Sequence, residues 1–178
     1  MAARSRSSTS TARRPSHDKR AGSRAARQQS AVRALRRIIR GLRLAGTETQ
    51  AESGVTAAQL FVLSQLDSSP AQSLNELGKR TMTDRTSVAP IVEHLAERGL
   101  VTSAAAAADR RRRIISITPA GRRLLHRAPR PPAAILIDAL AELPDQTLVS
   151  LDHGLRQLVR AMGLEEQPAV LLFDDARG

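Results

Sequence analysis

The chain has no cysteine, no tryptophan and no tyrosine, and only two of its 178 residues are phenylalanine. Without cysteine it cannot form a disulfide, sense oxidants through a thiol or build a cysteine–zinc site. Its histidines are scattered and lack the paired spacing of zinc ligands; they are His17, His94, His126 and His153. We therefore expect no metal site.

The sequence also lacks the motifs that mark common enzyme classes. It contains neither a glycine-rich phosphate-binding loop nor a Gly-x-Ser-x-Gly nucleophile elbow. We expect a protein that is not an enzyme and that needs no cofactor.

Long apolar runs are missing too. No stretch approaches the ~18 apolar residues of a transmembrane helix. The N-terminus has no apolar core of the kind found in secretory signals. These two absences predict a cytoplasmic protein without a membrane partner.

What the chain has in excess is positive charge. Lysine and arginine number 28 against 17 aspartate and glutamate residues, which gives a net charge of +11 and a sequence pI of about 11.7. Nearly all of the basic residues are arginine, whose planar guanidinium binds phosphate in a fork. Such a balance indicates nucleic acid or an anionic membrane surface as the partner.

Two short amphipathic segments, Ser73–Arg80 and Asp84–Arg98, are separated by a three-residue turn. Ser73 and Glu76 have the spacing of a capping box at a helix start. Thr83 or Asp84 can cap the second helix. Its apolar residues recur at i, i+3, i+4 and i+7, the spacing of one buried stripe; they are Val88, Ile91, Val92 and Leu95. The pattern predicts a helix-turn-helix whose second helix ends at Gly99.

The opposite face of the second helix carries small, hydroxyl and basic side chains, which can approach base edges and phosphates. The candidate DNA-binding residues are Arg85, Thr86, Ser87, Ala89, Pro90 and His94. Two of them have alternatives. Pro90 removes one helical hydrogen bond, although its early position limits the damage. His94 contacts a phosphate or is merely exposed.

A two-stranded ribbon is expected after this helix, from Leu100–Ser103 and Arg113–Ile117. Its tip holds an arginine run, and such a run is usually a solvated surface. Directly after a helix-turn-helix, we expect Arg110, Arg111 and Arg112 to contact phosphate or a narrow minor groove. Asp109 would repel phosphate, so we expect it to orient a neighbouring arginine. The combination predicts a winged helix-turn-helix with one helix in the DNA major groove.

The flanking segments predict five parts in the chain. Residues 1–29 form a basic tail that we expect to be disordered, either a solubilising segment or an arm that binds DNA phosphate. Residues 30–54 hold an amphipathic helix and a linker, residues 55–121 the DNA-binding lobe, residues 122–163 further helices, and residues 164–178 a flexible tail. The fold class is mainly α with a small β-ribbon.

The helices outside the lobe carry more apolar surface than one small winged domain can cover. In the first, Val32, Leu35, Ile39 and Leu42 form one stripe. A basic amphipathic helix can lie on a membrane, but packing against the C-terminal helices is the preferred interpretation. Pairing with a second copy would bury the excess, so we expect N- and C-terminal dimerisation helices and a homodimer.

In these motifs the chain resembles the MarR family of bacterial transcriptional regulators. The similarity rests on the spaced combination of Glu97-Arg98-Gly99-Leu100-Val101, Asp109-Arg110-Arg111 and Thr118-Pro119-Ala120-Gly121. The resemblance implies a homodimer on a pseudo-palindromic operator, often released by a small-molecule effector. The alanine run Ala104–Ala108 departs from the family, which tends to carry polar residues there. The lack of cysteine excludes its peroxide-sensing branch.

Two function classes follow from these patterns. The first is a sequence-specific transcriptional regulator of double-stranded DNA, expected to be a repressor, whose marker is the exposed face of the second helix. The alternative is a non-specific DNA-coating or architectural protein driven by the basic tail. Its binding would ignore sequence and collapse with salt.

Overall fold

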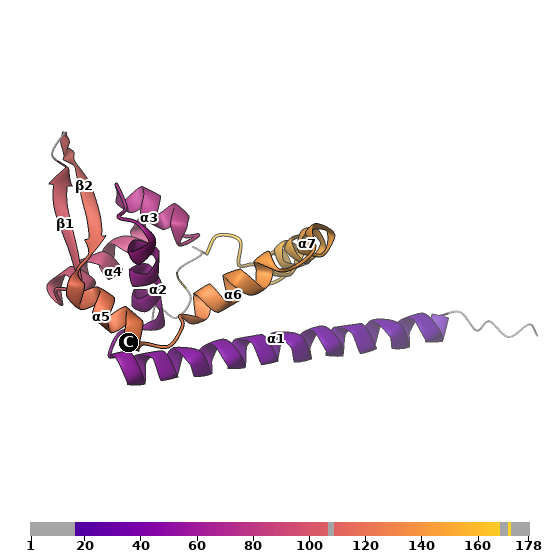
Figure 1. Ribbon diagram of the computed structural model, residues 1–178. Helices are drawn as coiled ribbons and strands as arrows, with labels where there is room; N and C mark the ends of the chain where they lie inside the picture. Colours follow the sequence, from indigo (N-terminus) through magenta and orange to yellow (C-terminus); the bar gives the residue numbers. More distant parts are fainter. Residues whose placement is uncertain (1–16, 107–108, 168–170, 172–178) are drawn as a thin grey trace, which may run out of the picture. The chain divides into compact units, whose positions relative to one another are not determined.

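Seven helices and one two-stranded antiparallel sheet make up the described part of the chain, residues 17–106, 109–167 and 171 of the computed structural model (Figure 1). Side chains are described outside residues 17–22 and 105–112. The elements are α1 (His17–Ser53), α2 (Ala57–Ser68), α3 (Leu74–Arg80), α4 (Arg85–Glu97), β1 (Val101–Ala106), β2 (Asp109–Ile117), α5 (Pro119–Arg127), α6 (Pro132–Ala141) and α7 (Asp145–Ala161). The expected class, mainly α with a small ribbon, is confirmed.

Helix α1 begins at His17, well before the expected start at Ser30. The disorder expected over residues 1–29 is therefore corrected from His17 onward, while residues 1–16 lie outside the described residues. The expectation relied on a missing apolar period. Alanine, arginine and glutamine have high helix propensity, so a helix forms there without an apolar stripe. The chain divides into two units, one up to Arg40 and one from Gly41.

Helix α2 lies at the centre of the core of the second unit. Its capping box is complete: Gln59 N–H donates to Thr56 Oγ1 at 3.2 Å, and Thr56 N–H donates to Gln59 Oε1 at 3.1 Å. Phe61, one of the two phenylalanines, is buried in this core. The same core takes in the apolar stripe of α4, which is Val88, Ile91, Val92 and Leu95.

The start of α3 and the turn between α3 and α4 follow the expected pattern, except that the capping box of α3 is incomplete. Ser73 Oγ accepts the N–H of Glu76 at 3.1 Å. The Glu76 carboxylate accepts the N–H of Gln72 at 2.8 Å, not that of Ser73, so the capping box is only half formed. Met82 has a φ of 56°, which lets the chain reverse between the helices within three residues.

The wing is longer than expected because β1 extends into the alanine run as far as Ala106 and β2 begins at Asp109, before the arginines. Their register pairs Val101 with Ile117 and Ala105 with Arg113, and it shifts between Ala105 and Ala106. Ile115 and Ile117 lie on the same side of β2, and both are buried. Two backbone hydrogen bonds between Ala71 and Ile115, of 2.8 and 2.9 Å, join the base of the wing to the lobe.

The end of α4 is held by contacts with the start of α5. Gly99 has a φ of 68°, which favours glycine, and it is the left-handed stop that the sequence predicts. Thr118 Oγ1 donates to the carbonyl of Gly99 at 2.8 Å and accepts the N–H of Gly121 at 3.0 Å. Thr118 thus caps α5 and fixes it against the end of α4.

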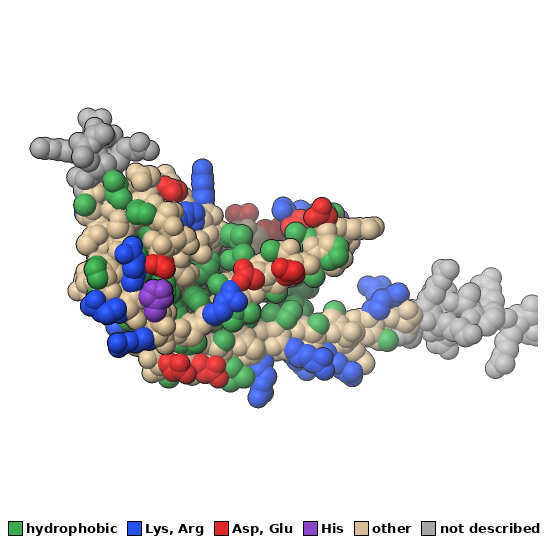
Figure 2. Space-filling view, in the orientation of Figure 1, with side chains coloured by type: hydrophobic (Ala, Val, Ile, Leu, Met, Phe, Trp, Pro, Cys, Tyr) green, Lys and Arg blue, Asp and Glu red, His purple; other side chains and the backbone are tan. Residues whose placement is uncertain are grey.

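Helices α6 and α7 leave apolar side chains at the surface, as Figure 2 shows. Helix α7 buries none of its residues. Its exposed apolar side chains are Leu148, Val149, Leu151, Leu155, Leu158 and Val159. Leu171 is buried in the core, so the flexibility expected for residues 164–178 is corrected at that position, where an apolar side chain finds a buried site.

Gly121 provides a test of the packing between α5 and the end of α4. A Cβ at this position would lie 2.2 Å from the carbonyl oxygen of Leu100 and 2.8 Å from Ile117 Cγ1. Because backbone cannot yield cheaply, we expect Gly121→Ala to lower the free energy of unfolding by about 1–3 kcal/mol or more. Urea unfolding at fixed protein concentration measures the change.

Gly41→Ala is the matched control. Gly41 lies inside α1 and has nothing within 4 Å of an added Cβ, so alanine should be neutral or stabilise by up to about 1 kcal/mol. Equal stability of the two variants would contradict the close packing at Gly121.

Candidate nucleic-acid interface

Burial of one stripe of α4 determines which side chains the helix presents. Leu95 and Val88 are fully buried, and Ile91 and Val92 nearly so. The helix therefore exposes the opposite face. Arg85, Thr86, Pro90, Glu93 and His94 are exposed there, and Ala89 is partly buried. The structure thus brings five of the six residues expected from this helix onto one surface, Ala89 at its edge.

Ser87 is the exception, since it is only 9% exposed. It precedes Ile91 by four residues and so shares the inward stripe. The base contact expected for Ser87 therefore stays a prediction, for a side chain that is mostly buried in this structure. Its small hydroxyl suits a position close to the helix cap.

Asp84 caps the N-terminus of α4 and organises its first turn. Asp84 Oδ1 accepts the backbone N–H of Ser87 at 2.8 Å and the hydroxyl of Thr86 at 2.6 Å. The hydrogen bond from Thr86, followed by the backbone hydrogen bond from Ser87, lowers the pKa of Asp84 below its ordinary value of 3.8. Because the Thr86 hydroxyl donates its proton to Asp84, it presents lone pairs and a methyl group outward.

Helix α4 is continuous through Pro90. Pro90 has no N–H to donate to the carbonyl of Thr86, four residues earlier. In the C-terminal half of α4, His94 Nδ1 lies 3.9 Å from Glu97 Oε2. The two form an ion pair only when the imidazole is protonated.

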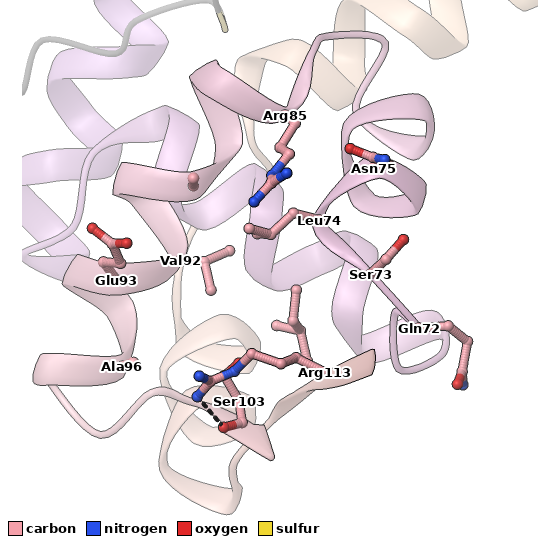
Figure 3. A pocket seen from close by; sticks show the side chains of 12 residues that line it. Gln72, Ser73, Leu74, Asn75, Arg85, Val92, Glu93, Ala96, Ser103 and Arg113 are labelled. Atoms are coloured by element: carbon pink, nitrogen blue, oxygen red, sulfur yellow. Dashed lines mark hydrogen bonds between the residues drawn. The ribbon is translucent and has the colours of Figure 1, made fainter. Parts of the chain in front are cut away.

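A cleft of about 470 Å³ opens beside α4. Figure 3 shows its three sides: Arg85 and Glu93 extend from α4, Ser73 and Asn75 from the start of α3, and Arg113 from the middle of β2. Two guanidinium groups and several neutral hydrogen-bonding groups therefore surround one open volume, with Glu93 as a carboxylate on its wall.

Arg113 is a cleft residue that the sequence analysis missed. Its Nε donates to Ser103 Oγ at 3.0 Å and its Nη2 to the Ser103 carbonyl at 2.9 Å (Figure 3). These bonds hold the guanidinium against Ser103 of β1. The signal was available in the alternation of the strand, because Arg113, Ile115 and Ile117 point to the same side.

The remaining wing residues cannot be placed in this surface. The backbone of Asp109, Arg110, Arg111 and Arg112 belongs to β2. Their side chains lie outside the described residues, so their expected contacts stay predictions.

A second cleft, of about 330 Å³, lies between the end of α1 and α5. It is lined by Glu52, Ser53, Ala120, Arg123, Leu124, Arg127 and Ala128. Next to it, Arg98 Nη1 donates to the carbonyl of Gly54 at 2.7 Å. This hydrogen bond connects the residue after α4 with the link between α1 and α2.

Neither a cluster of metal ligands nor a membrane-spanning helix is found within the described ranges. No group of three or more histidine, cysteine or acidic side chains there could hold a metal ion. Of the helices described, none combines the length and the apolar character that a bilayer span requires.

Comparison with known proteins gives one family. Residues 53–112 match the model of the MarR family. No curated protein matches the chain. A "probable transcriptional regulator" from Pseudomonas aeruginosa is 30% identical, with 70% of this chain and 93% of that chain covered and a TM-score of 0.47.

Two other solved structures share the fold. Sco3205, a MarR family transcriptional regulator from Streptomyces coelicolor in complex with DNA, is 20% identical, with 83% of this chain and 98% of that chain covered and a TM-score of 0.54. The transcriptional regulator BldR from Sulfolobus solfataricus is 20% identical, with 76% and 96% covered and a TM-score of 0.50.

The cap of α4 gives a pH-dependent prediction. A group whose pKa is lowered by folding stabilises the fold above its ordinary pKa, and the contribution is lost as the pH falls through the lowered value. We expect Asp84→Ala to unfold at a lower temperature than the wild type at pH 7. The difference should begin to shrink below pH 3.8 and disappear as the pH falls through the lowered pKa, where the carboxyl of the folded wild type becomes protonated.

Asp84→Asn is the control for this prediction, because asparagine caps a helix without a charge. It should retain most of the stability at pH 7. A difference between wild type and Asp84→Ala that stays constant down to about pH 2 would contradict a role for the ionised carboxylate.

Proposed function

We propose that this chain, which belongs to the MarR family of winged helix-turn-helix transcriptional regulators, is a sequence-specific repressor that binds a pseudo-palindromic operator as a homodimer. The observation that carries the proposal is the exposed face of α4, which stands next to a cleft with arginines on two sides. The structure of the similar Streptomyces coelicolor regulator was solved in complex with DNA.

In this proposal the N-terminal half of α4 reads bases in the major groove. Arg85 can donate two hydrogen bonds to guanine O6 and N7. Thr86 can accept from an adenine or cytosine amine, because its own proton is held by Asp84. Ala89 and Pro90 offer apolar contact to a thymine methyl group.

The cleft beside α4 suits the sugar–phosphate backbone. A phosphate bound there would receive charge-assisted hydrogen bonds from Arg113, with Ser73 and Asn75 as neutral donors, while Arg85 reads a base. Glu93 lines the same cleft and would repel a phosphate, so we place it toward the bases, where a carboxylate accepts from the cytosine amine. The wing arginines Arg110, Arg111 and Arg112 then follow the flanking groove.

The homodimer is supported by the apolar surface of α7. A helix without any buried residue does not gain stability from packing within one chain, and burying its stripe requires another surface. A second copy provides the identical stripe. Two lobes related in this way place two α4 helices about one DNA turn apart, which requires an operator with two half-sites.

The cleft between α1 and α5 is the place we propose for a small effector. Arg123 and Arg127 on its wall favour an anionic ligand. The wall also includes Glu52 and Ser53, directly before Gly54, whose carbonyl holds Arg98. A ligand that shifts this segment would move the end of α4 and weaken DNA binding.

Sequence-independent DNA coating remains the second candidate function, since the net charge of +11 attracts any DNA. The two candidate functions differ in the ratio of the affinity for the operator to the affinity for scrambled DNA. A regulator binds its operator at least about a hundredfold more tightly than scrambled DNA, whereas a coating protein binds both equally.

Fluorescence titration near 0.15 M salt compares the affinities of the protein for operator and scrambled DNA. The operator is taken from the DNA upstream of the coding region or, if that shows no preference, from selection on randomised duplexes. We expect Arg85→Ala to lose about tenfold to a hundredfold at the operator and much less on scrambled DNA.

Arg156→Ala is the control for Arg85→Ala. Arg156 is exposed on α7 and pairs with Asp152 at 2.9 Å, so its loss should leave operator binding nearly unchanged. Failure of selection to enrich any sequence would favour the coating protein, and equal losses of Arg85→Ala on both DNAs would remove Arg85 from base reading.

Two exposed residues of α7 test the proposed dimer interface. Leu151 lies on the apolar stripe of α7, while Val149 lies on its other face and is also exposed. Leu151→Glu would place a charge in the proposed interface, so it should yield a monomer in light scattering and lose operator binding. Val149→Glu should stay dimeric. Monomeric wild-type protein, or dimers of both variants, would contradict this interface.

A further inference from the structure

Helix α1 carries an arginine stripe that has no acidic neighbours. We use this name for Arg33, Arg36, Arg37 and Arg40, which are all exposed. They fall within about 100° of the helix circumference, opposite Leu35 and Ile39, because successive residues are about 100° apart. The sequence contains no aspartate or glutamate between Lys19 and Thr47.

Three exposed arginines near the C-terminal end of the described chain are paired with acids, unlike those of the stripe. On α7, Arg156 pairs with Asp152 at 2.9 Å, and Arg160 pairs with Glu165 at 2.9 Å. Arg130 pairs with Asp138. Within the described residues, none of the arginines in the stripe has an ion pair, so their charges are balanced only by solvent and salt.

The spacing within the stripe makes this imbalance unfavourable for the isolated helix. Arg33 and Arg37 are four residues apart, as are Arg36 and Arg40. Like charges at this spacing destabilise a helix. A polyanion along the stripe would convert the repulsion into attraction, and it would stabilise the helix that binds it.

We propose that the arginine stripe of α1 is a second DNA-binding surface, which holds the phosphate backbone of duplex DNA independently of base sequence. Arg33 and Arg40 are separated by about 10 Å of helix rise. That distance corresponds to roughly three phosphates along one DNA strand. This surface neither requires nor replaces the base reading proposed for α4.

A membrane surface is the competing anionic partner, and two observations disfavour it. A helix that lies in a membrane inserts apolar and aromatic side chains on the face opposite its basic residues, and α1 contains no aromatic residue. Its apolar side chains, such as Ile39, belong to the stripe expected to pair with a second copy. DNA contact through the arginines leaves that apolar face available.

The test measures binding of the full chain to a random-sequence duplex of 40 base pairs over a series of salt concentrations. One variant replaces Arg33, Arg37 and Arg40 with glutamine, which has a similar helix propensity. The control variant replaces Arg130, Arg156 and Arg160 with glutamine and thus removes the same net charge. A third variant replaces the stripe residues Arg33, Arg37 and Arg40 with lysine.

We expect the stripe variant to bind random DNA about tenfold or more weakly near 0.1 M salt, with the slope of log affinity against log salt smaller by about 2–3. Its helix content should be unchanged or higher, because repulsion is relieved. The control should keep the wild-type slope, and the lysine variant should bind like the wild type.

Three outcomes would overturn the proposal. Equal losses by the stripe and control variants would reduce the effect to net charge. Unchanged binding by the stripe variant would leave the arginines as a solvated surface. Loss of binding to phosphatidylserine vesicles, with DNA binding intact, would assign the stripe to a membrane. Because random DNA contains no operator, none of these results depends on the specificity proposed for α4.

Discussion

The burial of one apolar stripe of α4 against the core is the constraint on which the DNA-facing surface depends. Val88 and Leu95 are completely buried, so the helix cannot rotate about its axis without exposing them. One residue corresponds to about 100° of rotation, and a change of that size would bring Ser87 outward and turn Arg85 away. The residues proposed to read bases are therefore selected by the apolar residues behind them.

Polar contacts at the two ends of α4 complete this constraint. Asp84 holds the first turn, and Thr118 fastens the residues that follow the helix to α5. The wing is fixed to the same lobe through Ala71. The backbone positions of the two cleft arginines are thus fixed within the lobe, and Ser103 also holds the Arg113 guanidinium, which lowers the entropy lost on binding DNA.

Features that depend on neighbouring residues could be predicted from the sequence. The caps by Thr56, Asp84 and Thr118 and the stop at Gly99 all follow from short spacings, and the structure has each of them. Features that depend on distant pairing could not. The position of Arg113 requires the hairpin register, and the burial of Ser87 requires the exact phase of α4 on the core. The early start of α1 reflects propensity, which an analysis of apolar periods does not detect.

Net charge and specificity make separate contributions in this molecule. A phosphate-binding stripe on α1 would strengthen binding to operator and random DNA by the same factor, so the ratio of the two affinities would not change. It would instead slow dissociation from all DNA and make the affinity steeper in salt. Discrimination has to come from groups that differ in energy between base pairs, and the side chains exposed by α4 are the ones proposed for this role. A large positive charge is therefore compatible with a specific regulator, and only the affinity ratio separates it from a coating protein.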